Sequence, residues 1–98
     1  ATSLKKEISY SAGGIFSKQL LAEPEMTLFC MAAGTAISEH AAARAGAVIV
    51  LEGKGEFVLL GKKIVMEAGA IFDLPIDAPH SLRAEKDTSF LLVLAGKT

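Results

Sequence analysis

The sequence predicts an all-β fold, built as an antiparallel sandwich or barrel. From Met26 onward the chain consists of short segments rich in Val, Ile, Leu and Phe, each about five to eight residues long and bounded by glycine, proline or a polar turn. These segments follow one another at even spacing, and no stretch with the period of an amphipathic helix separates them. Many short strands arranged in this way are typical of antiparallel sandwiches and barrels.

Taken in order along the chain, the apolar segments predict eight strands. They cover residues 26–34, 35–40, 45–53, 55–61, 62–69, 70–75, 80–85 and 88–96. Because glycine supplies the positive φ that tight hairpins need, we expect hairpins at "LEGKGEF" (51–57) and "LLGKKI" (59–64). The polar stretch "EKDT" (85–88) predicts a further hairpin.

The remaining segments leave alternatives open. We assign residues 1–25 to an N-terminal arm or edge strand that precedes a barrel of residues 26–95, all within one domain of residues 1–98. In the arm, "GIFSKQLLA" predicts an edge strand or a short helix, and "AEPE" predicts a turn. The alanine-rich stretch 39–47 could form a helix, because alanine is the best helix former. Gly46 and the β-branched run 48–50 favour a strand that turns through a bend of small residues instead.

Composition and charge narrow the possible partners. The net charge is −1 and the Lys and Arg residues are scattered, so binding to nucleic acid is disfavoured. The longest apolar runs are too short to span a bilayer, which predicts no membrane association. Cys30 is the single cysteine, which excludes an internal disulfide and fits a reducing, cytoplasmic compartment. Apolar residues make up 51% of this small chain, and such a surplus predicts a homodimer.

Two histidines are the strongest candidates for chemistry. Imidazole binds Zn, Fe, Ni, Cu and Mn, although a stable site usually needs three or four protein donors. His40 ends one predicted strand and His80 begins another, so the two can meet only if the sheet closes on itself. Pro75 and Pro79 stiffen the chain on the approach to His80, because each proline fixes its own φ.

The spacing of glycine, proline and histidine resembles that of the small single-domain cupins, over residues 26 to about 94. That family carries the motifs G(X)5HXH(X)3,4E(X)6G and G(X)5PXG(X)2H(X)3N. The positions that match them here are Gly34, His40 and Gly53 for the first motif, and Gly69, Pro75 and His80 for the second. The resemblance implies a cupin-type antiparallel β-barrel, also described as a double-stranded β-helix or jelly roll.

The departures from these motifs bear on the metal. Ala42 replaces the second histidine of the first motif, and its glutamate falls on Gly46. Asp77 and Ala84 stand where the second motif has glycine and asparagine. The family usually holds its metal through three histidines and one glutamate, so the resemblance implies a degenerate site with two of four ligands.

A third ligand has several candidates besides solvent. They are Cys30 on the preceding strand, Asp77 on the turn before His80, and Glu39 if a bulge turns it inward, since strand neighbours point to opposite faces. The metal would be Fe, Mn, Ni, Cu or Zn. The alternative is that His40 and His80 line the barrel and hydrogen-bond to each other or to water.

Around the histidines we expect a pocket for a modest, largely apolar ligand, because small and apolar side chains flank them. Its predicted lining residues are Ala36, Ser38, Ala42, Val48, Val50 and Leu82. Three functions follow: a metal-dependent enzyme of the dioxygenase, isomerase or decarboxylase type, a non-catalytic binding module, and a degenerate structural cupin that dimerises without metal. Fold resemblance alone does not choose among them.

Overall fold

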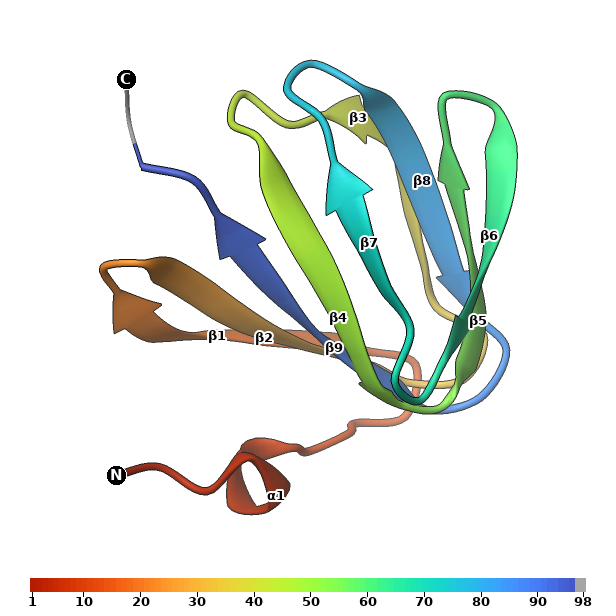
Figure 1. The fold of residues 1–98 in the computed structure, drawn as a ribbon. Coiled ribbons are helices and arrows are strands. Elements are labelled where there is room, and N and C mark those ends of the chain that lie inside the picture. Colours follow the sequence, from red (N-terminus) through yellow and green to blue (C-terminus); the bar gives the residue numbers. More distant parts are fainter. Residues whose placement is uncertain (97–98) are drawn as a thin grey trace.

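Two antiparallel sheets face each other in the computed structural model, which describes residues 1–96 (Figure 1). One sheet has five strands in the order β1-β2-β9-β4-β7, and the other has four in the order β3-β8-β5-β6. The elements are α1 (Leu4–Glu7), β1 (Ile15–Ala22), β2 (Glu25–Met31), β3 (Ala36–Ala41), β4 (Gly46–Glu52), β5 (Lys54–Leu59), β6 (Lys62–Glu67), β7 (Ile71–Leu74), β8 (Pro79–Ala84) and β9 (Thr88–Leu94). The all-β prediction is confirmed, and a strand is present at each of the eight expected places.

One of the three expected hairpins forms. Strands β5 and β6 pair through the two-residue turn Leu60-Gly61, where both residues have positive φ, as a type I′ turn requires. The other two predictions are wrong, because β4–β5 and β8–β9 each cross from one sheet to the other. At Gly53 a Cβ atom would lie 2.3 Å from the carbonyl oxygen of Asp87, so glycine here permits the two crossing segments to touch. Turn residues reveal a change of direction, but not which strand the chain pairs with next.

The N-terminal segment covers part of the outer face of the five-stranded sheet. The stretch "GIFSKQLLA" forms edge strand β1 and not a helix, and residues 23–24 make the expected turn into β2. Ahead of β1, the side chains of Leu4, Ile8 and Tyr10 pack on a second buried cluster that includes Leu28 and Cys30. Residues 42–45 form a bend between β3 and β4, so the alternative of a helix over 39–47 is wrong. Among the described residues, no helix is long and apolar enough to cross a membrane.

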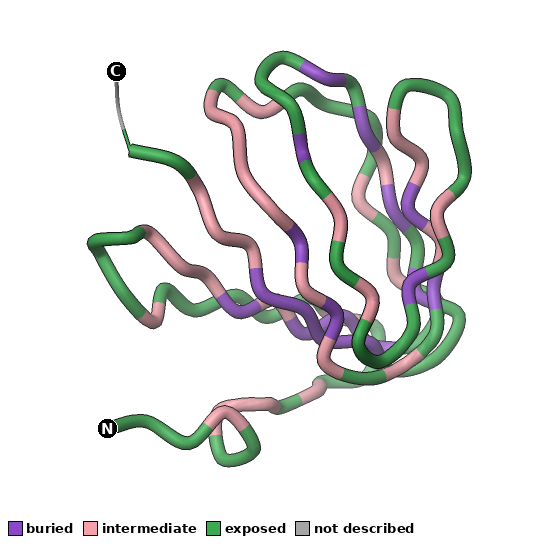
Figure 2. Tube along the Cα trace, in the orientation of Figure 1, coloured by how far each residue is buried: buried purple, intermediate pink, exposed green. Residues whose placement is uncertain are grey.

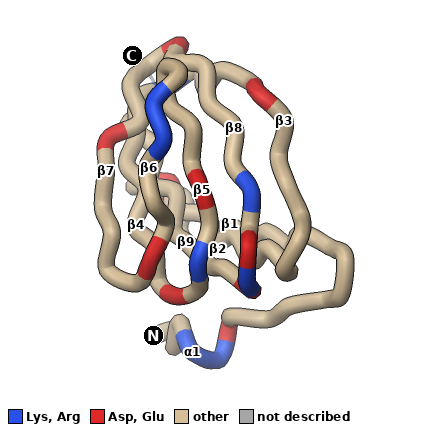
Figure 3. Tube along the Cα trace, turned by 90° about the vertical axis from the view of Figure 1, so that its right-hand side faces the viewer, with Lys and Arg blue, Asp and Glu red and all other residues tan. Residues whose placement is uncertain are grey.

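The main core lies between the two sheets and is densest at one end. Figure 2 shows buried residues concentrated where the sheets come together, with mostly exposed and half-buried residues toward the opposite end. The buried residues of this core are Met31, Val48, Val50, Phe57, Met66, Leu74, Leu82, Ala84 and Phe90. The outer face of the four-stranded sheet is charged, and it carries the loose ion pair of Lys63 with Glu56 at 3.9 Å (Figure 3). That face is solvated, so a site for a small apolar molecule is expected in the space between the sheets.

Candidate functional site

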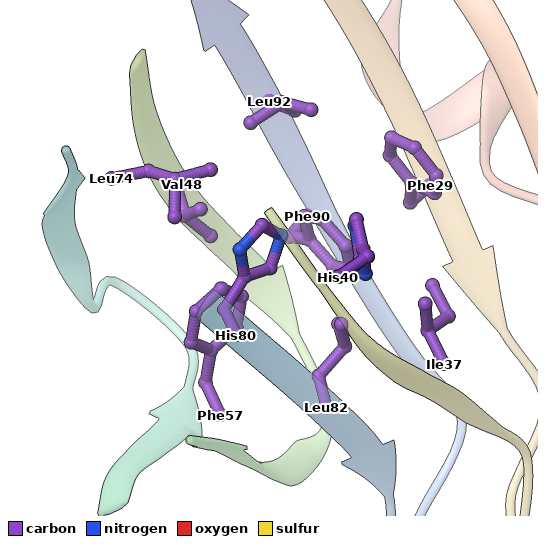
Figure 4. Close-up of a pocket in the computed structure, with 10 residues that line it drawn as sticks. All are labelled: Phe29, Ile37, His40, Val48, Phe57, Leu74, His80, Leu82, Phe90 and Leu92. Carbon is purple, nitrogen blue, oxygen red and sulfur yellow. The ribbon is translucent and has the colours of Figure 1, made fainter. Parts of the chain in front are cut away.

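The two histidines meet on neighbouring strands of the four-stranded sheet. His40 near the end of β3 is paired directly with His80 in β8, and the centroids of their rings lie 4.1 Å apart with 58° between the ring planes. The chain brings them together because β8 returns beside β3 after the chain has made β4 to β7. Forty residues of sequence separation thus become a side-by-side contact (Figure 4).

The backbone holds both rings in the same tautomer. Nδ1 of His40 lies 2.9 Å from the carbonyl oxygen of Ser38, and Nδ1 of His80 lies 3.0 Å from that of Ala78. A carbonyl oxygen can only accept a hydrogen bond, so Nδ1 carries the proton in each neutral ring and donates it. Each Nε2 therefore retains its lone pair, and this is the arrangement in which protein histidines bind metals or accept a proton from a ligand.

The two rings differ in their exposure to solvent. His80 is buried, at 5% exposure, and its ring stacks on that of Phe57 with a centroid distance of 5.5 Å and only 4° between the planes. Phe57 in turn packs edge-to-face against Phe72, which fixes the stack from behind. His40 is exposed. The pair therefore lies at the boundary between the core and solvent.

A β-bulge in β3 decides which residues share the face of His40. Ile37 pairs with Leu82 and His40 with His80, so β3 has one more residue than β8 over this interval. The extra residue reverses the alternation, and Ile37 joins His40 on the inner side. The sequence-based assignment of Ala36 and Ser38 to the pocket lining assumed strict alternation from His40, and it needs correction: both residues are exposed.

A small apolar cavity lies beside the histidine pair (Figure 4). Its volume is about 60 Å³, and it is lined by Phe29, Ile37, His40, Val48, Phe57, Leu74, His80, Leu82, Phe90 and Leu92. Of the six residues expected to line the pocket, Val48 and Leu82 do so. Val50 belongs to the closed part of the core, and Ala42 packs against that core from the bend after β3.

Several residues that line the cavity were not predicted from the sequence, because their pattern is that of ordinary core residues. Phe29 and Phe90 stack at 5.0 Å between centroids, and Leu92 lies two residues beyond Phe90 on the same face of β9. Period-two alternation along β2 and β9 places these side chains inside. What the sequence lacks is the information that this part of the core stays open.

The proposed third ligands do not join the pair. Cys30 lies on the opposite side of the five-stranded sheet, under the N-terminal segment, where burial raises the pKa of its thiol and favours the neutral form. Glu39 and Asp77 are both exposed, and the backbone N–H of Asp77 donates to the carbonyl of Ala42. Within residues 1–96, no three His, Cys, Asp or Glu side chains are grouped closely enough to hold a metal ion. The side chains that could bind a transition metal here are therefore the two neutral imidazoles of His40 and His80.

Comparisons with known proteins agree with this architecture. Residues 27–96 match the family model described as "Cupin domain". A cupin 2 conserved barrel domain protein from Leptotrichia buccalis superposes with a TM-score of 0.87 and 32% identity, over 95% of this chain and 46% of that one. A RmlC-like cupin protein from Desulfovibrio desulfuricans gives a TM-score of 0.84 and 26% identity, over 97% and 94% of the two chains.

A third structure is an enzyme. Salicylate 1,2-dioxygenase from Pseudoaminobacter salicylatoxidans, solved as adducts with gentisate, gives a TM-score of 0.77 and 22% identity, over 93% of this chain and 28% of that one. At that identity the likeness concerns the fold alone. A search of curated proteins finds no match.

Proposed function

This chain belongs to the cupin domain family, and from that premise we propose that it binds a small, largely apolar molecule between its sheets through His40 and His80. The observation that carries the proposal is the pair of Nε2 lone pairs beside a cavity lined otherwise by apolar side chains. A few polar atoms in an apolar wall are the usual composition of a small-molecule site.

The chemistry of the pair specifies what it can contact. Two neutral imidazoles whose Nδ1 atoms already donate to the backbone offer two Nε2 acceptors and no free donor. They suit a ligand hydroxyl or another neutral donor. A carboxylate would be repelled by both lone pairs unless one ring became protonated. A neutral, donor-bearing ligand is therefore favoured over an organic anion.

A first-row transition metal is the second partner that the pair could take. His40 and His80 would hold Fe, Mn, Ni, Cu or Zn through Nε2, and the backbone carbonyls of Ser38 and Ala78 would keep the rings oriented. A bound metal would supply Lewis acidity to a ligand that completes its coordination. Without an anionic protein ligand the affinity should be low, and the remaining positions would be taken by solvent or by the bound molecule.

The lack of a third protein donor among the described residues favours a binding module over an enzyme. A dioxygenase reaction would need a redox-active metal held tightly enough to turn over, and an isomerase or decarboxylase reaction would have only the two imidazoles as general bases. Glu39 and Asp77, the nearest acidic candidates in the sequence, are exposed. We therefore place reversible binding first and metal-dependent chemistry second.

Elemental analysis and nuclear magnetic resonance together test the proposal. Wild-type protein, prepared without metal-affinity columns or chelators, is supplied with each of the five metals and dialysed, and its metal content is measured. In parallel, 2-butanol is titrated while the ring resonances of both histidines are followed. Movement of these resonances in wild type, lost in His80→Ala, supports the site. If neither alcohol nor metal perturbs either ring, the proposal is rejected.

The proposal includes a homodimer in a cytoplasmic setting. Large apolar side chains are exposed on strands β1, β6 and β7, among them Ile15, Phe16, Leu21, Val65 and Ile71. Exposed large apolar side chains are commonly covered when subunits associate. Light scattering at micromolar concentration should give twice the chain mass of 10.2 kDa. A monomer at that concentration would reject the dimer but leave the histidine site untouched.

A further inference from the structure

Two loops at the open end of the sandwich adopt a backbone conformation that non-glycine residues rarely use. Within residues 1–96, the non-glycine residues with positive φ are Leu60, at 52°, and Asp77, at 60°. Leu60 lies in the β5–β6 turn and Asp77 in the β7–β8 loop, and Figure 1 shows both loops at the same end of the fold. Left-handed backbone of this kind costs on the order of 1–2 kcal/mol for a residue such as leucine.

Backbone hydrogen bonds tie these two loops to the strand ends that carry the histidines. The N–H of Leu60 donates to the carbonyl of Pro79 at 3.0 Å, and Pro79 directly precedes His80. The N–H of Asp77 donates to the carbonyl of Ala42 at 2.8 Å, just after β3 ends. The unusual conformations are thus held in place beside the pair of rings, and local strain retained at such a position is typical of functional sites.

Each loop presents a large apolar side chain to solvent. Leu60 is 59% exposed, and Ile76, the neighbour of Asp77, is 58% exposed. A type I′ turn ordinarily carries Asn or Gly at the position of Leu60, so leucine there is unfavourable both for the backbone and for solvation. Fold stability alone gives no reason for a leucine at this position.

The size of the cavity supplies a reason. A volume of about 60 Å³ is far below the roughly 300–1,000 Å³ of typical ligand sites. A molecule that contacts His40 and His80 can place only a short alkyl group inside, and the rest of it must lie over the open end. We propose that Leu60 and Ile76 form an apolar rim, and that this rim binds the part of the ligand that protrudes past the histidines.

The rim of Leu60 and Ile76 defines the class of ligand more narrowly than the two histidines do. The ligand would be a neutral molecule whose hydroxyl group lies between two apolar arms, a short arm in the cavity and a longer one on the rim. Secondary alcohols with a terminal methyl group have this shape. The inference rests on the proposed function, because without binding at the histidines the rim has nothing to orient.

A chain-length series tests the rim. Affinities of 2-butanol, 2-hexanol and 2-octanol are measured by resonance titration with the full chain. If the longer arm is buried on the rim, each added methylene should strengthen binding by about fourfold, the effect of about 0.8 kcal/mol per buried methylene. The double variant Leu60→Asn, Ile76→Ser should bind 2-butanol as wild type does but gain less than about 1.5-fold per methylene. Asn tolerates positive φ, so this variant preserves the turn.

The control is Val65→Ser, which removes a side chain that is 57% exposed on β6 and belongs to no loop at this end. It should retain the wild-type gain with chain length. If 2-butanol shifts the histidine resonances but longer alcohols bind no better, or if the double variant keeps the full gain, the rim is rejected and the histidine site stands. If no alcohol shifts either ring, the proposed function fails and the rim fails with it. A double variant that changes oligomeric state with unaltered affinities would also overturn the rim, assigning Leu60 and Ile76 to a subunit interface.

Discussion

The imidazole rings of His40 and His80 are partners across a single antiparallel strand pair, with their centroids 4.1 Å apart and each Nδ1 held by the carbonyl oxygen two residues earlier. The identical backbone contact at both residues means that neither ring needs to turn over before its Nε2 can accept a proton or bind a metal. Preorganisation of this kind lowers the entropy lost on binding. The site is therefore small and offers only two side chains that can bind a metal, but the orientation of both rings is fixed.

The first prediction concerns the metal. His80→Ala should abolish uptake of any first-row transition metal, because one remaining imidazole is too weak a site. Glu39→Ala should change metal content little, since Glu39 is exposed and belongs to no group of three donors among residues 1–96. Elemental analysis after dialysis against each metal checks both variants. Equal metal content in wild type and His80→Ala would show that any bound ion lies elsewhere.

Acidification should release a metal held in this way. Neutral imidazole is the binding form, and protons compete for the same Nε2 lone pair. Metal content measured at about pH 7.5 and about pH 5.5 should therefore fall at the lower value. Undiminished content at the lower pH would contradict coordination by two histidines alone.

The second prediction concerns Gly46, which stands where the cupin motif has its glutamate. A Cβ atom at this position would lie 2.4 Å from the carbonyl oxygen of Val93 on the neighbouring strand. Gly46→Glu should therefore fail to restore a metal ligand, and Gly46→Ala should destabilise the fold by about 1–3 kcal/mol through overpacking. Gly96→Ala, where nothing lies within 4 Å of the new Cβ, should change stability by less than about 0.5 kcal/mol. Urea denaturation compares wild type with Gly46→Ala and Gly96→Ala, and elemental analysis measures the metal content of Gly46→Glu.

The third prediction concerns Phe57, which supports His80 from inside the core. This side chain is 2% exposed and contacts both His80 and Phe72 through its ring. Phe57→Ala should lower the free energy of unfolding by about 3–5 kcal/mol, because a large cavity is left behind. Phe16→Ala, at a side chain 39% exposed on edge strand β1, should cost about 1 kcal/mol or less. Similar losses in the two variants would contradict the assignment of Phe57 to the core.

The fourth prediction concerns Tyr10, which fastens the N-terminal segment to the five-stranded sheet. Burial and the nearby Glu52 carboxylate, which accepts a 3.0 Å hydrogen bond from the hydroxyl, raise the pKa of Tyr10 to about 12 from 10.0. A raised pKa means that the folded chain keeps a proton that the unfolded chain releases, so this contribution to stability is complete below pH 10 and is lost toward pH 12.

Comparison with Tyr10→Phe isolates this effect from the titration of lysines. The stability advantage of wild type over Tyr10→Phe should be greatest below pH 10 and should shrink between pH 10 and about 12. Denaturation at several pH values in this interval measures it. A constant difference across the interval would mean that Tyr10 titrates alike in the folded and unfolded chains.

The fifth prediction separates stability from binding at Leu60. Leu60→Gly should stabilise the fold by about 1 kcal/mol, because glycine adopts positive φ without strain. Leu60→Ala retains the strained φ and should give no such gain. Both variants should bind 2-octanol more weakly than wild type. A glycine variant that is less stable than wild type would show that the exposed leucine makes a contact that maintains the turn.

Local sequence patterns were sufficient to predict the strands of this protein from β2 to β9. Segments rich in β-branched and aromatic residues, separated by turn residues, placed all eight strands from Met26 onward. The motif spacing singled out His40 and His80, which the structure brings side by side. Such signals act over a few residues, so a single chain displays them directly. The choice between strand and helix for residues 14–22 stayed open because its residues fit both.

Tertiary structure decided everything that depends on which strand lies beside which. The crossings at 53 and 85–87 carry the same glycine and polar residues as a hairpin, and only competition between the two sheets for pairing partners determines that they cross. The bulge before His40 reversed the inner face of β3, which removed Ser38 from the lining and added Ile37. Whether the core beside His80 closes or stays open depends on how side chains from seven strands fill one volume, and that is a property of their joint packing in three dimensions.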